Sequence, residues 1–120
     1  MRKFVWEDRE QEAMPAVGTG QVLRRFVSGE QMTVAQVQFQ AGSEVLEHQH
    51  ENEQFTLVLS GTMEFTVEGQ KVLVGPGEVL HLPARVPHSA RAEVDSVLID
   101  VFSPPRTDWI AGPDPLEPRD

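Results

Sequence analysis

Apolar and polar side chains alternate along much of the chain, which is the pattern of β-strands that bury one face. Within residues 32–40, Ala35, Val37 and Phe39 fall on one side and three glutamines on the other. Residues 62–68 repeat this pattern. Glycine and proline interrupt the chain at short intervals. The runs between them alternate and lack the spacing of three to four residues that an amphipathic helix would show. The sequence therefore predicts an all-β fold.

Short apolar runs between turns that contain Gly or Pro predict further strands. They cover residues 22–27, 54–60, 71–74, 79–82, 88–92 and 96–102. About eight short strands without a strong helix favour a closed barrel or a double-sheet jelly roll, since such folds leave few strand edges exposed. A chain of 120 residues has the size of a single domain.

The two ends of the chain differ from its middle and predict a division into three parts. Residues 21–102 are expected to form the barrel, with an N-terminal arm at 1–20 and a Pro-rich C-terminal arm at 103–120. The large aromatic residues of the arms are Phe4, Trp6 and Trp109. These side chains are expected to pack either on the barrel or on a second subunit, and apolar arms of this kind favour a homodimer.

Charge and composition narrow the classes of partner. The formal net charge of −9 disfavours phosphate backbones and anionic lipid, so we expect neither nucleic acid nor a membrane as partner. Cysteine is absent, which excludes disulfides, zinc–thiolate sites, iron–sulfur ligation and thiol nucleophiles. No run reaches the ~18–20 apolar residues of a membrane span, and residues 1–10 become charged too soon for a secretory signal. The expected location is cytoplasmic.

All four histidines lie between positions 48 and 88, within the predicted barrel. His48 and His50 are separated by one residue, so an extended strand places both imidazoles on one face, about 6.5–7 Å apart. Gln54 follows the same parity, and Glu53 points away. Two such imidazoles can converge on one metal ion, although His pairs on strands also occur without one. His81 lies in an apolar run and is expected to be structural.

The last predicted strand carries one charged residue in an otherwise apolar run. Asp100 shares its face with Leu98 and Phe102, where placing a carboxylate costs free energy. We therefore expect Asp100 to have a functional role. Arg106 follows after two prolines, and its guanidinium could reach back over the barrel mouth and hold a substrate carboxylate in a two-pronged contact. A surface ion pair with Asp100 or Asp108 is the alternative.

The spacing around the first two histidines resembles the first motif of the cupin family. Five residues separate Gly42 from His48, one residue separates His48 from His50, three residues separate His50 from Gln54, and six residues separate Gln54 from Gly61.

A later segment resembles the second cupin motif. Five residues separate Gly77 from Pro83, and His88 follows five positions further on. The resemblance covers roughly residues 40–92 and implies a double-stranded β-helix, the jelly-roll barrel of cupins, with a metal ion in its mouth. The ligands that it implies are His48, His50, Gln54 and His88.

One departure from the family pattern bears on the metal, because the family usually has a Glu ligand where this chain has Gln54. An amide oxygen is uncharged, so three imidazoles and an amide leave the charge of a divalent ion unneutralised. Such a site is better suited to an ion that polarises a hydroxyl or carbonyl than to an iron that changes its oxidation state with oxygen. Glu53 would restore the commoner ligand set but has the wrong strand parity. The expected cofactor is one divalent transition metal: nickel, iron, manganese, cobalt or zinc.

The ending from Asp100 to Trp109, joined to the first motif, resembles the pectin-degradation branch of the cupins, whose characterised members open the ring of 4,5-unsaturated uronates. By this resemblance Asp100 would move a proton as acid or base, Arg106 would hold the uronate carboxylate and Phe102 would wall the sugar face. The expected function is metal-dependent, non-redox ring opening of a small anionic substrate. The alternatives are a lyase or isomerase for another small acid, a metal-dependent dioxygenase, and a non-catalytic metal- or sugar-binding cupin.

Overall fold

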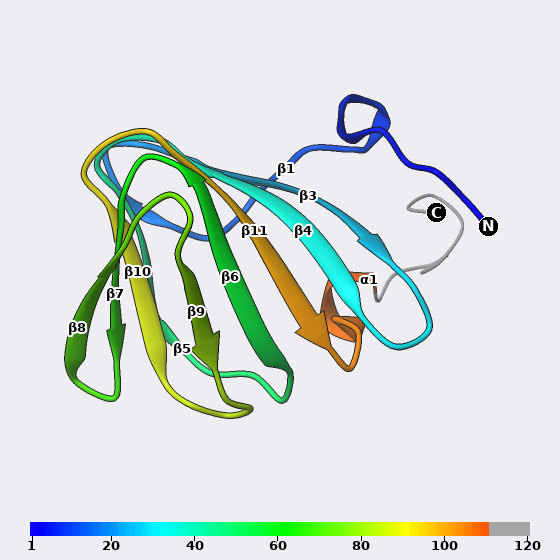
Figure 1. Ribbon diagram of the computed structural model, residues 1–120. Coiled ribbons are helices and arrows are strands. Elements are labelled where there is room, and N and C mark those ends of the chain that lie inside the picture. The colour runs from blue at the N-terminus through cyan, green and yellow to red at the C-terminus, as the bar shows by residue number, and fades with distance from the viewer. Residues whose placement is uncertain (111–120) are drawn as a thin grey trace.

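Strands with one apolar face bury it by stacking two antiparallel sheets around a shared core (Figure 1). The computed structural model describes residues 1–110. The first sheet contains, in spatial order, β1 (Glu12–Ala13), β3 (Val22–Ser28), β4 (Thr33–Phe39), β11 (Ser96–Ser103), β6 (Glu53–Ser60) and β9 (Val79–Leu82). The second sheet contains β2 (Val17–Gly18), β5 (Ser43–His48), β10 (His88–Ala92), β7 (Met63–Val67) and β8 (Gln70–Val74). The described helices are η1 (Trp6–Asp8) and α1 (Thr107–Ile110).

The predicted all-β, double-sheet jelly roll is confirmed. The alternating segments at 32–40 and 62–68 form β4 and β7, each within one or two residues of the expected bounds. The sequence analysis did not predict β5 as a separate strand. Its six residues do not alternate clearly, because only Ser43 is fully buried and the last three residues are exposed.

The two ends of the chain contribute to the fold. Residues 1–20, predicted as an arm, supply β1, which pairs with β3, and β2, which pairs with β5. Trp109 in α1 packs on its own barrel, with its ring centroid 5.0 Å from that of Phe102 and 5.4 Å from that of Phe26. Residues 111–120 of the predicted C-terminal arm lie outside the described residues, and the boundaries at 20 and 102 stay predictions. Within residues 1–110, no helix is long and apolar enough to cross a membrane.

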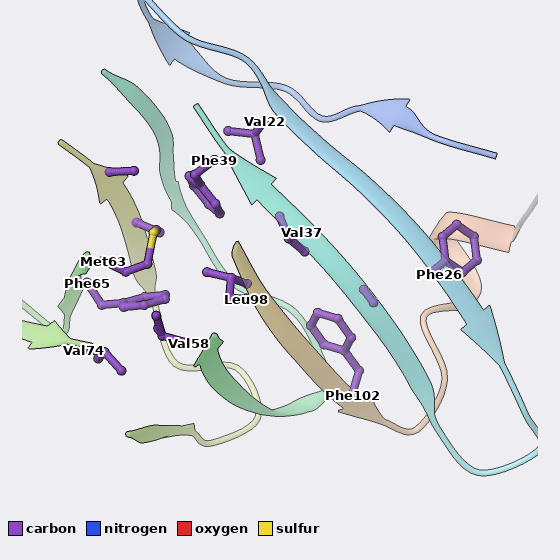
Figure 2. Close-up of a cluster of buried hydrophobic side chains, with 13 residues drawn as sticks. Val22, Phe26, Val37, Phe39, Val58, Met63, Phe65, Val74, Leu98 and Phe102 are labelled. Atoms are coloured by element: carbon purple, nitrogen blue, oxygen red, sulfur yellow. The ribbon is translucent and has the colours of Figure 1, made fainter. Parts of the chain in front are cut away.

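The core fills the space between the sheets with aliphatic and aromatic side chains from both (Figure 2). Its fully buried members include Val22, Val37, Met63 and Leu98. Phe102 lies at one end of this cluster, beyond Leu98 on the same strand. The apolar cluster therefore continues toward the polar residues described below, which share the same interior.

Strand register places the polar residues of this interior next to one another. β11 lies between β4 and β6, and its buried positions alternate along the strand. Asp100 on β11 is paired with Thr56 on β6, and Phe102 is paired with Gln54 on the same two strands. On the opposite sheet, His48 at the end of β5 is paired with His88 at the start of β10. The chemistry-bearing residues thus reach the interior from both sheets.

Gly61 provides a test of the turn between β6 and β7. Its φ of +80° is left-handed, and a Cβ there would lie 2.2 Å from Ser96 Oγ and 2.5 Å from the Asp95 carbonyl oxygen. Gly69 has a similar φ of +82°, but nothing lies within 4 Å of its added Cβ. We predict that Gly69→Ala lowers the free energy of unfolding by about 1–2 kcal/mol, the cost of a left-handed alanine. Gly61→Ala is expected to cost clearly more, and equal losses in urea denaturation would contradict this account of the turn.

Candidate functional site

Three of the four histidines meet where β5 ends and β10 begins. The ring centroids of His48 and His88 are 4.4 Å apart, and those of His50 and His88 are 5.1 Å apart. Each imidazole offers one nitrogen, and these nitrogens all lie within 4.8 Å of one another. Nitrogens grouped this closely can close on a single ion, whose bonds to imidazole nitrogen are about 2.0–2.1 Å long. These three residues could therefore hold a metal ion.

The tautomer of each imidazole follows from its backbone contact. The Nδ1 atoms of His48, His50 and His88 lie 2.9, 3.0 and 2.9 Å from the carbonyl oxygens of Leu46, Asn52 and Val86 respectively. A carbonyl oxygen only accepts, so Nδ1 carries the hydrogen and donates it in all three rings. Each Nε2 atom then carries a lone pair. Such backbone contacts orient metal-binding histidines, so the rings are prepared to bind through Nε2.

Gln54 adds an oxygen to this group. Its buried side chain comes from β6, and its Oε1 lies 3.1 Å from His50 Nε2. With the hydrogen of His50 on Nδ1, both atoms present lone pairs, so one cation could bind to both. Three imidazole nitrogens and one amide oxygen suit a divalent transition metal. The predicted ligands are thus brought together, and their chemistry fits the ion.

Glu53 and His81 lie outside this cluster. The Glu53 carboxylate points to the outer surface, where its Oε2 lies 2.7 Å from His81 Nε2. The His81 ring also contacts Phe55, with centroids 4.8 Å apart. The strand parity that separates Glu53 from Gln54 explains this arrangement, since neighbouring residues of a strand face opposite sides.

The electrostatics of the site keep two of the imidazoles neutral. Burial lowers the pKa of His50, and the positive charge of Arg106 adds to this effect. Burial also lowers the pKa of His88 to about 4. Both rings therefore keep the Nε2 lone pair that a metal ion requires at neutral pH.

Asp100 lies deeper in the same interior. Its Oδ1 accepts a hydrogen bond of 2.6 Å from the hydroxyl of Thr56, which in turn accepts one of 2.9 Å from Gln54 Nε2. Burial raises the pKa of Asp100 to about 6, against the lowering effects of Thr56, Gln54 and Arg106. A carboxyl group with such a pKa can both hold and release a proton near neutral pH.

Arg106 makes a two-pronged contact with Asp108, and its contact with a substrate carboxylate stays a prediction. Its Nε and Nη2 donate to the two carboxylate oxygens of Asp108, at 3.0 and 2.8 Å. This is the ion pair with Asp108 that was the alternative. The buried guanidinium also lies over the rings of Phe102 and Trp109, at 4.7 and 4.3 Å from their centroids. The pair holds the pKa of Asp108 below its usual value.

Two neighbouring cavities give access to these groups. The outer cavity, of about 510 Å³, has Arg24, Arg106, Trp109 and His48 in its wall, together with mostly apolar residues from 14–17 and 45–46. The inner space, of about 40 Å³, is lined in part by His48, His88, Gln54, Asp100 and Phe102. His48 and Trp109 belong to both walls, so one candidate metal ligand, His48, stands where the two spaces meet.

The sequence analysis missed two residues of this region. Thr56 is two positions from Gln54, and that parity alone could have placed it on the same face of the strand. The Arg24 guanidinium lies 4.0 Å from the centroid of the Trp109 ring, which the Arg106 guanidinium also contacts. No signal could have found it, because Arg25 follows directly and the pattern does not show which arginine reaches the cavity.

The fold and the histidine cluster define a class of protein: a jelly-roll barrel with a candidate metal site in its interior. Residues 35–102, more than half of the chain, match the family model described as Cupin domain. The chain therefore belongs to the cupin family.

The relatives include cupins of pectin degradation, which confirms that resemblance. The chain is 27% identical over 113 residues to the pectin degradation protein KdgF of Dickeya dadantii, covering 92% of this chain and 100% of the relative. The solved structure of KdgF from Halomonas sp. has a TM-score of 0.69 and 34% identity, over 73% of this chain and 83% of that chain. Quercetin 2,3-dioxygenase of Bacillus subtilis is 32% identical over 81 residues, covering 62% of this chain. The chain spans only 24% of that dioxygenase.

Proposed function

We propose that this protein is a metal-dependent cupin enzyme that opens the ring of 4,5-unsaturated uronates, without net oxidation or reduction. The observation that carries the proposal is the inner space that one buried carboxyl group, Asp100, shares with His48 and His88 of the three-imidazole cluster. The likeness to pectin degradation proteins along nearly the whole chain supports the substrate class.

The ligands of the metal would be His48, His50, His88 and Gln54. When bound, a divalent ion would supply Lewis-acid stabilisation to a substrate oxygen. Asp100 Oδ2 is free of the Thr56 hydrogen bond, which uses Oδ1, and is the atom that would give or take the proton.

The substrate would be held by the residues around the two cavities. Phe102 lies beside His50, with ring centroids 5.6 Å apart, and would wall one face of the sugar. Arg106 and Arg24 are the cationic residues in the wall of the outer cavity, where they are paired with Asp108 and Glu12, and an anionic substrate would bind to them. Arg106 would bind the uronate carboxylate.

The direct test is incubation of metal-loaded protein with 4,5-unsaturated galacturonate, followed by NMR of the ring protons. The proposal predicts faster loss of the ring form and appearance of the linear keto product. Metal-stripped protein should be inactive and should recover when the ion is restored. An unchanged rate of ring opening with the loaded protein would refute the proposed function.

Replacing Arg106 tests its role in carboxylate binding. A hydrogen bond to a charged group is worth about 1.5–3 kcal/mol, so Arg106→Gln should raise KM for the uronate by about 10–100-fold. KM for a neutral analogue should change little. Steady-state kinetics with both substrates measure the difference.

Asp108→Asn is the matched control for that variant. It weakens the ion pair with Arg106 but keeps the guanidinium and its stacking on Trp109. KM for the uronate should then stay the same or fall, because Arg106 is freer to bind a carboxylate. Equal increases for charged and neutral substrates in Arg106→Gln would remove Arg106 from substrate recognition.

The mostly apolar wall of the outer cavity favours a second candidate function, a dioxygenase of less polar substrates. The relative quercetin 2,3-dioxygenase belongs to that class by name. The two functions differ in oxygen demand. Oxygen uptake with an iron-loaded protein and an aromatic substrate, together with loss of activity under anaerobic conditions, would support the dioxygenase.

A further inference from the structure

Thr56 occupies a position between the candidate metal ligands and the buried acid. It lies on β6 with 0% of its surface exposed, two residues from Gln54 on the same strand face. Its cross-strand partner on β11 is Asp100. The hydroxyl therefore bridges a candidate ligand and the candidate proton carrier, and it contacts both within hydrogen-bond distance.

The direction of the hydrogen bonds follows from what each group can donate. The Thr56 hydroxyl has one hydrogen and gives it to the Asp100 carboxylate. Its oxygen can then only accept from Gln54, so the amide must present Nε2 to Thr56. The amide oxygen must in consequence face His50 Nε2, 3.1 Å away. One hydroxyl thus decides which end of the Gln54 amide is offered to the metal position.

The same bonds explain why a neutral side chain stands at position 54. A glutamate there has no hydrogen to donate to Thr56, so the two carboxylates at 54 and 100 would compete for one hydroxyl hydrogen. Both groups are buried, where a carboxylate without a donor and near a like charge is costly. An amide at 54 and a carboxylate at 100 give the Thr56 hydroxyl one donor and one acceptor.

We propose that Thr56 is a positioning residue that aims the Gln54 oxygen at the metal position, and that the amide at 54 and the carboxylate at 100 depend on each other through it. This inference rests on the metal-binding part of the proposed function and is independent of the uronate substrate. Thr56 itself would contact neither the metal nor the substrate and would act through Gln54.

The first test is the affinity for Zn²⁺, measured by calorimetric titration of metal-free protein. Thr56→Val keeps the shape and removes the hydroxyl, and it should weaken Zn²⁺ binding by about 10–100-fold, as is typical when a partner of a metal ligand is lost. Thr56→Ser keeps the hydroxyl and should bind within about threefold of the unchanged protein. A folded Thr56→Val protein with unchanged affinity, or a Thr56→Ser protein as weak as Thr56→Val, would overturn the proposal.

The second test measures the interdependence of positions 54 and 100 without metal. Gln54→Glu should lower the melting temperature of the metal-free protein, and adding Asp100→Asn should restore most of the loss. In the double variant Thr56 donates to Glu and accepts from Asn, so the hydroxyl again has one donor and one acceptor. Additive effects of the two substitutions, or a Gln54→Glu protein as stable as the original, would contradict it. This test holds even if Thr56→Val fails to fold.

The outcomes separate this inference from the proposed function. Unchanged protein that binds Zn²⁺ but does not open the uronate ring would refute the substrate and leave the role of Thr56 in place. Failure of the unchanged protein to bind Zn²⁺ would overturn both.

Discussion

His50→Ala is expected to abolish turnover while the barrel stays folded. The His50 ring contacts those of His48, His88 and Phe102, and its Nε2 approaches the Gln54 oxygen. Replacing it with alanine removes one candidate ligand and its contacts with the others. Stabilisation of a substrate oxygen by a metal is worth several kcal/mol, which corresponds to a loss of about 10³-fold or more in kcat/KM.

The fold should survive because His50 lies in the loop after β5 and outside the apolar core. Circular dichroism should show an unchanged β-sheet spectrum and a cooperative thermal transition. His81→Ala is the matched control, since its imidazole lies on the outer surface against Glu53. That variant should keep full activity. Retained turnover in folded His50→Ala protein, or in protein stripped by a chelator, would exclude a metal-dependent mechanism.

Asp100→Asn is expected to reduce kcat by about 10²–10⁴-fold, the usual contribution of a general acid or base. The asparagine oxygen can still accept the hydrogen bond from Thr56, so the packing around β11 is kept. KM should change little, because the side chain acts on the proton and does not hold the carboxylate. The measurement is steady-state kinetics with the unsaturated uronate, supported by a thermal melt.

Asp95→Asn provides a control with the same chemical change. Asp95 precedes β11 and accepts a hydrogen bond from the backbone N–H of Ala41, outside the described cavities. An asparagine oxygen can take over that bond, so activity should be unchanged. If Asp100→Asn and Asp95→Asn behaved alike, Asp100 would not be the proton carrier. If the unchanged protein had no turnover and Asp100→Asn left the affinity for the ligand intact, the protein would instead be a binding module.

The alternation of side chains was sufficient to predict most of the fold, because burial on one face leaves a clear period of two in β4, β7 and β11. The strand β5 was harder to find, since its last three residues are exposed. The short strands β1 and β2 have two residues each, too few for any periodic pattern. Their pairing with β3 and β5 depends on the tertiary structure. The expected homodimer and cytoplasmic location stay predictions.

Parity along a strand also predicted much of the candidate site. It placed Gln54 on the interior side and Glu53 on the exterior, and it put Asp100 beside Phe102. The partner of Arg106 could not be chosen from the sequence, because Asp100 and Asp108 were both within reach. The structure pairs it with Asp108, and that choice depends on how the chain turns back after β11 to form α1.

The central claim is that the Nε2 atoms of three histidines converge on one ion, and titration with Zn²⁺ followed by ¹⁵N NMR of the imidazoles tests it most directly. The account predicts saturation near one equivalent, with the Nε2 resonances of His48, His50 and His88 shifted and their Nδ1 atoms still protonated. The resonances of His81 should stay unchanged. Saturation without a shift of the three Nε2 resonances, or no binding of Zn²⁺, would contradict the account.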